Sequence, residues 1–306
     1  MSLSVQLAPQ NSRGLELVNP VMTASGTFGY GTEYRHLFNI QRLGAIVCKG
    51  TTLKPCPGNP QPRLAEVEHG LLNSVGLENI GLQALIEEKT PVWASWRVPV
   101  IVNIAAGSVA DYALLASRLD GVAGVTALEV NISCPNIKDG CEFGAEPKSA
   151  AAVTEAVRRA TSLPVLVKLS PATASMAAMA RAVAAAGADA ITVMNTLKGM
   201  AIDVGKRRPL LGNVTGGLSG PAVKPVALAM VYEVAGATAV PVIGCGGIAS
   251  AADAMEFIMA GASAVQVGTA SLVNPRAPIE IIEGMEKYLA EEGIKDIKDL
   301  VGVGRG

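Results

Sequence analysis

The segment Pro164–Leu169 reads PVLVKL, a short apolar run that carries a single lysine near its end. Runs that are apolar at consecutive positions are typical of parallel strands buried on both faces, and proline is tolerated at the first position of a strand. Seven further segments share this character, and each is followed by polar or glycine residues and then a helical pattern. They are Pro20–Ala24, Ala45–Lys49, Pro99–Ile104, Ala127–Ile132, Ala190–Asn195, Pro241–Gly246 and Ala264–Gly268.

Helical patterns lie between these strands. We expect one helix over Ser149–Ala160 with Ser149 as its N-cap, and another over Met176–Ala186 that ends at Gly187. A third, Ser250–Met259, opens with SAAD, which resembles a capping box. Strands that alternate with helices in this way predict a (β/α)₈ TIM barrel, with a doubly wound open sheet as the alternative.

Two longer insertions interrupt the alternation. Thr51–Val98 and Lys198–Val223 are predicted to be lids or extra loops at the rim of the barrel. The chain contains no low-complexity tract or linker that would divide it, so residues 1–306 are expected to form a single domain.

Composition limits the functional classes. The 25 basic and 26 acidic side chains nearly cancel, so the chain lacks the excess positive charge that would attract nucleic acid or an anionic membrane. No apolar run reaches the roughly 18 residues of a membrane span, and the N-terminal segment lacks a secretory pattern, so we expect a cytoplasmic protein. Five cysteines without a Cys-x-x-Cys pair, and only two histidines, argue against metal centres and histidine-based triads.

Unusual residues fall at the predicted carboxyl ends of the strands, where barrel active sites lie. Sequence separation is too large for local packing to explain this, so we expect these side chains to converge on one mouth. They are Ser25, Lys49, Asn103, Asn131, Lys168, Asn195, Gly246–Gly247 and Gly268–Thr269.

The chemistry of these residues points to a charged, hydrogen-bonding ligand. Glycines after the seventh and eighth predicted strands favour phosphate, because bare backbone N–H groups can approach the anion. Two lysines at one mouth favour an anionic ligand between them. The side-chain amides of Asn103, Asn131 and Asn195, with Asn73 from the first insertion, can both donate and accept hydrogen bonds. They suit a ring with alternating N–H and C=O groups, such as a pyrimidine or a flavin.

Cys134 lies in EVNISCPN (Glu129–Asn136), just past a strand end and before a proline that forces a turn. The surrounding polar residues favour a nucleophile or a general base, and the motif leaves the two roles open. Cys48, Cys56 and Cys245 are interpreted instead as core or loop residues.

An ordered set of motifs resembles the class 1 dihydroorotate dehydrogenases. The set runs from about Asn19 to Thr269 and comprises NSVGLEN, NISCPN, VKLSP, NTLKGMAID, GGLSGPAVKP and GCGGI. NTLKGMAID (Asn195–Asp203) resembles the B-type catalytic subunit rather than the fumarate-using A type. The resemblance implies an FMN-binding barrel that oxidises dihydroorotate to orotate in pyrimidine (UMP) biosynthesis.

The resemblance also implies a role for individual residues. Cys134 would remove the C5 proton of dihydroorotate while FMN accepts the C6 hydride. The implied FMN-contacting residues are Ser25, Lys49, Gly50, Asn103, Asn131, Lys168, Val193, Gly220, Gly246, Gly247, Gly268 and Thr269. The implied substrate-binding residues are Lys49, Asn73, Ser74, Val75, Gly76, Leu77, Asn131, Asn195 and Thr196.

B-type relatives pass electrons to a second subunit that carries FAD and a [2Fe–2S] cluster, with NAD⁺ as the terminal acceptor. The resemblance therefore implies a homodimeric core within a heterotetramer of two catalytic and two electron-transfer subunits. Competing interpretations are a fumarate-using enzyme, a dihydropyrimidine dehydrogenase-like domain, a flavin-free phosphate-binding barrel and a non-catalytic binding subunit.

Overall fold

The computed structural model, which describes residues 1–133 and 142–306, places eight parallel strands in one sheet, in the order β3-β16-β15-β10-β9-β8-β7-β4. A parallel bridge between Met22 and Ala45 joins the two end strands and closes the barrel. The predicted TIM barrel is therefore confirmed, and the open sheet is wrong. The strands are β3 (Val21–Thr23), β4 (Ile46–Val47), β7 (Val100–Ile104), β8 (Ala127–Asn131), β9 (Val165–Lys168), β10 (Ala190–Val193), β15 (Val242–Cys245) and β16 (Ala264–Val267).

The barrel strands are almost wholly buried, as their continuous apolar character requires. Every residue of β9, β10, β15 and β16 is buried. One face of each strand packs inside the barrel, and the other packs against helices, so both alternating sets of side chains leave water. All eight predicted strands are confirmed.

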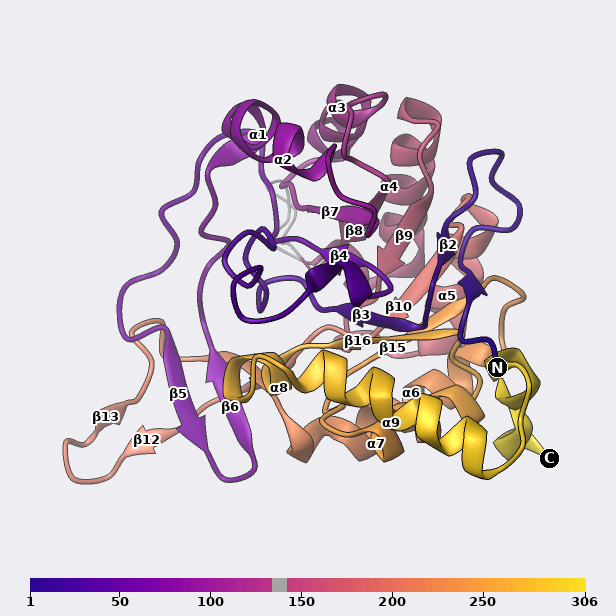
Figure 1. Ribbon diagram of the computed structural model, residues 1–306. Coiled ribbons are helices and arrows are strands. Elements are labelled where there is room, and N and C mark those ends of the chain that lie inside the picture. The colour runs from indigo at the N-terminus through magenta and orange to yellow at the C-terminus, as the bar shows by residue number, and fades with distance from the viewer. Residues whose placement is uncertain (134–141) are drawn as a thin grey trace.

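Helices cover the outside of the barrel (Figure 1). Segment 81–93 is one helical stretch in which a π-helical turn (Leu85–Lys89) separates α1 (Gly81–Ala84) from α2 (Thr90–Trp93). Within the described ranges, none of the helices combines the length and apolar character that crossing a bilayer requires. The others are α3 (Val109–Leu119), α4 (Pro147–Ala160), α5 (Met176–Ala185), α6 (Lys224–Ala235), α7 (Ala251–Met259), α8 (Thr269–Val273) and α9 (Ala277–Glu291).

The predicted helix starts are partly confirmed. Ser250 caps α7, and its backbone N–H donates in return to the Asp253 carboxylate, which completes the predicted capping box. The N-cap prediction for Ser149 is wrong, because α4 begins two residues earlier, at Pro147. Proline suits this first helical position, since its φ is already helical and its missing N–H is not needed there. The Ser149 hydroxyl instead donates to the carbonyls of Phe143 and Glu146.

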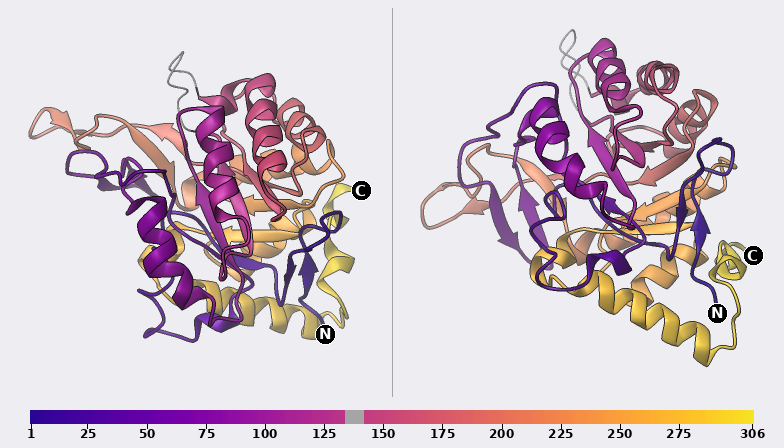
Figure 2. Two further views of the ribbon diagram at one scale, coloured as in Figure 1. Left: turned by 90° about the horizontal axis from the view of Figure 1, so that it is seen from above. Right: turned by 45° about the horizontal axis from the view of Figure 1, so that its top comes forward.

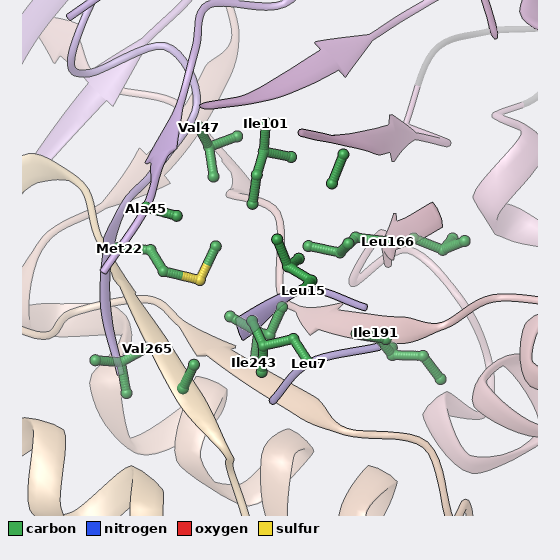
Figure 3. Packing of buried hydrophobic residues seen from close by; sticks show 14 of the residues in the cluster. Leu7, Leu15, Met22, Ala45, Val47, Ile101, Leu166, Ile191, Ile243 and Val265 are labelled. Carbon is green, nitrogen blue, oxygen red and sulfur yellow. The ribbon is translucent and has the colours of Figure 1, made fainter. Parts of the chain in front are cut away.

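An N-terminal hairpin, which the sequence did not predict, closes the N-terminal end of the barrel. Strands β1 (Val5–Gln6) and β2 (Glu16–Leu17) pair antiparallel, and the Asn11 amide donates to Asp189, just before β10. Leu7 and Leu15, both buried, project among barrel side chains such as Ile243 (Figure 3). The hairpin thus fills the end of the barrel opposite the one where the strands finish.

The two insertions contribute to a second sheet at the other end of the barrel. Strands β5 (Leu64–Val67) and β6 (Gly70–Asn73) come from the first insertion, and β11 (Leu197–Gly199) and β14 (Gly216–Ser219) from the region of the second. They form one antiparallel sheet in the order β11-β14-β6-β5, whereas lids or extra loops at the rim were predicted. A further hairpin, β12 (Ile202–Asp203) with β13 (Arg208–Pro209), extends outward beside it (Figure 2).

Candidate active site

A cavity of about 990 Å³ opens at the carboxyl ends of the barrel strands, between the barrel and the rim sheet β11-β14-β6-β5. Residues from both insertions and from all eight strand ends contribute to its wall, so the predicted convergence is confirmed. The predicted site residues that line it are Ser25, Lys49, Gly50, Asn73, Val75, Gly76, Leu77, Asn103, Asn131, Lys168, Asn195, Thr196, Gly220, Gly246, Gly247, Gly268 and Thr269.

Among the described residues, two predicted site residues are not part of this wall. Ser74 and Val193 are buried and lie behind it. The Ser74 hydroxyl has no hydrogen-bond partner among the described residues. Cys134 lies outside the described residues.

Lys168, the last residue of β9, is buried with its ammonium group toward the cavity. Its Nζ donates to Oε1 of Gln266 (3.1 Å). Burial disfavours the ammonium, but the Cys245 sulfur and the Glu129 carboxylate outweigh this effect and raise the pKa of Lys168 above its ordinary value. Lys168 is thus cationic at neutral pH.

Glu129 and Gln266 form a buried hydrogen-bond network behind the cavity that was not predicted from the sequence. Glu129 is fully buried in β8 and accepts hydrogen bonds from Asn103 (2.8 Å), Thr192 (3.0 Å) and Gln266 (2.5 Å). Gln266 therefore connects the Glu129 carboxylate to the Lys168 ammonium. A polar residue inside an otherwise apolar strand was the signal that could have found both.

Lys49 follows β4 and lies 3.6 Å from the carboxylate of Glu78, which also pairs with Arg63 at 2.8 Å. Glu78 balances the charge of Lys49 as Glu129 balances that of Lys168. The two lysines therefore do not by themselves require an anionic ligand, because each has a carboxylate near it within the protein. Ligand contact by either lysine remains a prediction.

Amides converge on one side of the cavity. Nδ2 of Asn195 donates both to Oδ1 of Asn131 (3.2 Å) and to Oγ of Ser133 (2.9 Å). On the opposite wall, Nδ2 of Asn73 donates to the carbonyl of Gly217 (3.1 Å), so the rim sheet holds this amide in place. The wall thus presents donors and acceptors on short, anchored side chains.

Glycines shape the part of the cavity next to β15 and β16. Gly246 and Gly247 have φ of 135° and 76°, which favour glycine. A Cβ at Gly247 would lie 2.7 Å from the backbone nitrogen of Lys224, so the loop packs directly on the start of α6. Asp253 accepts the N–H groups of Ala249 and Ser250 and thereby ties the same loop to α7.

Two cysteines near the cavity are held as neutral thiols. Burial raises the pKa of Cys48 to about 12, in agreement with its interpretation as a core residue. Cys245 lines the cavity, which the sequence did not predict; burial raises its pKa, and Lys168 offsets only part of this effect. Because the Cys245 thiol is neutral, the counter-charge to Lys168 is the Glu129 carboxylate, to which Gln266 connects it.

Within the described part of the chain, no group of three or more His, Cys, Asp or Glu side chains is arranged to hold a metal ion. The cavity instead offers ammonium groups, amides, hydroxyls and bare backbone. Its volume is at the upper end of the range for small-molecule and cofactor sites, about 300–1,000 Å³.

Comparison with known proteins points to one family. The family model for dihydroorotate dehydrogenase matches residues 7–289. Proteins named dihydroorotate dehydrogenase B (NAD(+)), catalytic subunit, are similar over nearly the whole chain. The protein from Desulforamulus reducens is 58% identical over 94% of this chain and 95% of its own length. The protein from Pelobacter propionicus is 56% identical over 95% of this chain and 96% of its own length. The protein from Geobacter metallireducens is 54% identical over 98% of this chain and 97% of its own length.

Proposed function

The chain belongs to the dihydroorotate dehydrogenase family, and we propose that it oxidises dihydroorotate to orotate in pyrimidine biosynthesis, with FMN as its bound cofactor. The observation that carries the proposal is the convergence of Lys49, Lys168 and the amides on one cavity beside a glycine-lined wall. Members of the family are oxidoreductases, and the close relatives are the catalytic subunits of NAD⁺-type enzymes.

The chemistry of the cavity wall fits a flavin. A flavin ring has an edge of alternating C=O and N–H groups, which Lys168, Asn103 and Asn131 can match with donors and acceptors. Gly50 supports this fit, because a Cβ at that position would lie 3.2 Å from Oδ1 of Asn103 and crowd the amide. In our proposal Ser25 is a further contact of the flavin ring, and the backbone around Val193 supports the ring site from behind.

The phosphate of FMN would bind the wall formed by Gly246, Gly247, Gly268 and Thr269, with Gly220 beside it. Gly246 and Gly247 have no side chains to obstruct an approaching anion, and their positive φ values turn the loop sharply. Thr269 donates to Ser219 (2.8 Å), which connects this wall to the rim sheet.

Dihydroorotate would bind between the flavin and the rim sheet. We assign its carboxylate to Lys49, where it would share the ammonium with Glu78. Its ring amides would pair with side-chain and backbone groups on both sides of the cavity, with Ser74 supporting this wall from behind. The remaining substrate-binding residues in this proposal are Asn73, Val75, Gly76, Leu77, Asn131, Asn195 and Thr196.

Cys134 acts as the base in this proposal and removes the proton from C5. Bound FMN supplies the acceptor for the hydride that leaves C6. The Lys168 ammonium stabilises the negative charge that develops at the acceptor, in a buried site where such an interaction is strong. Cys245 is a poor alternative base, because burial raises its pKa and keeps it protonated.

Electrons then leave through a partner. The relatives are named as catalytic subunits of an NAD⁺-type enzyme, which supports an electron-transfer subunit for this chain. We propose that this subunit carries FAD and a [2Fe–2S] cluster, reduces NAD⁺, and assembles with a homodimer of this chain into a heterotetramer.

Cofactor analysis and two acceptor assays test the proposal. The purified chain should be yellow and release FMN on denaturation, whereas a colourless protein that refuses FMN would support a flavin-free barrel. The isolated chain should not use fumarate, and NAD⁺ reduction should appear only when the electron-transfer subunit is added. Turnover with fumarate at the rate obtained with the partner would assign the chain to the fumarate-using type.

A further inference from the structure

A buried carboxylate in the middle of the barrel has no role in the proposed reaction. Glu129 is fully buried in β8 and is not part of the cavity wall. Burying a charged carboxylate costs about several kcal/mol unless hydrogen-bond donors compensate for the lost water. The groups that hydrogen-bond to Glu129 therefore have to explain why a carboxylate lies in an otherwise apolar strand.

Three side chains from three other strands donate to Glu129. Oε1 accepts Nδ2 of Asn103 from β7 (2.8 Å). Oε2 accepts Oγ1 of Thr192 from β10 (3.0 Å) and Nε2 of Gln266 from β16 (2.5 Å). An ionised carboxylate only accepts hydrogen bonds, so each partner must turn a donor toward it.

This requirement decides which way two amides face. Because Nδ2 of Asn103 is bound to Glu129, its Oδ1 points away, next to Gly50 and toward the cavity. Because Nε2 of Gln266 is bound to Glu129, its Oε1 is left to accept the Lys168 ammonium (3.1 Å).

We propose that Glu129 is a positioning residue that makes Asn103 an acceptor toward the bound flavin and, through Gln266, orients the Lys168 ammonium toward the same ring. The inference rests on the proposed function and adds to it the group that sets the hydrogen-bond polarity of the ring site. The site then selects a ring edge with an N–H facing Asn103 and a carbonyl or anionic nitrogen facing Lys168.

Glu129→Gln tests this inference because the new amide cannot satisfy its neighbours. Its NH₂ must replace either Oε1 or Oε2, and both positions face donors. In the first case Asn103 must flip and turn its NH₂ to the cavity. In the second, Gln266 must flip and turn its NH₂ to Lys168. We expect FMN binding to the apoprotein to weaken about 10- to 100-fold, the range for one lost hydrogen bond to a charged group.

An exchange of the two groups should restore binding. In Asn103→Asp/Glu129→Gln, the new amide donates to the new carboxylate and still accepts from Thr192 and Gln266. The carboxylate at position 103 has a second oxygen for the cavity. We expect its FMN affinity to return to within about threefold of wild type, since contacting residues couple strongly. Asn103→Asp alone places two carboxylates face to face and should bind FMN weakly.

Thr192→Val separates positioning from general stability. It removes one donor to the same carboxylate but leaves both amides oriented, so the melting temperature should fall while FMN affinity changes less than about twofold. FMN dissociation constants, measured by the quenching of flavin fluorescence on apoprotein, give the readout for all variants.

The outcomes are distinct. If the wild-type apoprotein does not bind FMN, the proposed function and this inference are both wrong. If the wild type binds FMN and Glu129→Gln binds it equally well, or the exchange binds no better than Glu129→Gln, the inference alone is overturned. If a single variant does not fold, the exchange decides: it should fold and bind FMN, and its failure to bind overturns the inference.

Discussion

Gly247→Ala should selectively impair the phosphate end of the flavin site. Gly247 has φ of +76°, and a Cβ there would lie 2.7 Å from both the backbone nitrogen and the Cβ of Lys224 at the start of α6. Ordinary contacts begin near 3.4 Å, so the loop must move by about 0.7 Å to accept the methyl group. Backbone cannot rotate away as a flexible side chain can.

The size of the effect follows from this displacement. A binding group must be held within about 0.5 Å of its productive position. A hydrogen bond to a charged group is worth about 1.5–3 kcal/mol, so losing one to the phosphate lowers affinity roughly 10- to 100-fold. We therefore expect FMN affinity to fall about 10- to 100-fold, whereas riboflavin, which has the ring without the phosphate, should lose less than about threefold. Titration of apoprotein with both flavins gives the two dissociation constants.

Gly121→Ala is the matched control. Gly121 has φ of +74°, almost the same backbone strain, but a Cβ there would meet nothing within 4 Å. Its substitution should cost about 1–2 kcal/mol of stability and leave both flavin affinities unchanged. Equal losses for FMN and riboflavin in Gly247→Ala, or no loss at all, would refute the assignment of this loop to the phosphate.

Three further predictions concern the base, the barrel end and the rim. Cys134→Ala should lower turnover by about 10²- to 10⁴-fold in steady-state assays while the bound-flavin spectrum persists, and Cys134→Ser should keep some activity at raised pH; near-wild-type turnover at neutral pH would exclude the base assignment. Leu15→Ala should reduce the free energy of unfolding by about 2–5 kcal/mol in denaturant titrations, with FMN affinity unchanged, because Leu15 fills the end opposite the cavity. Burial opposes the charged form of Asp253, but bonds from Lys224 and the Ala249 N–H outweigh it and lower its pKa. A carboxyl group with a lowered pKa stabilises the fold above its unfolded pKa and loses that contribution as pH falls. Asp253→Asn should therefore lower the free energy of unfolding by about 1 kcal/mol at pH 7 and by progressively less below about pH 4. A loss of stability that does not depend on pH would contradict this.

The barrel could be predicted because its strands have a strong local signal. Runs such as Pro164–Leu169 are apolar at consecutive positions, which only burial on both faces explains. The rim sheet lacked such a signal, because its strands are short and rich in glycine, as in Gly216–Ser219. Its pairing of Gly217 with Asn73 joins segments far apart in the sequence, which no local pattern encodes.

The site was predictable where topology alone places a residue. Parallel strands in a barrel all end at one rim, so Lys49, Lys168 and Asn195 had to meet there once the strands were assigned. The residues behind them were not predicted, since their role depends on contacts across the barrel. Glu129 acts through Asn103 and Gln266 on two other strands, and only three-dimensional packing brings these side chains together.

The half-reaction itself tests the central claim most directly. Dihydroorotate is added anaerobically to the purified, flavin-loaded chain while the visible flavin band is followed. The account predicts that the band bleaches and that one orotate forms per flavin, without any partner subunit present. A flavin band that stays unchanged in the presence of saturating dihydroorotate would contradict it.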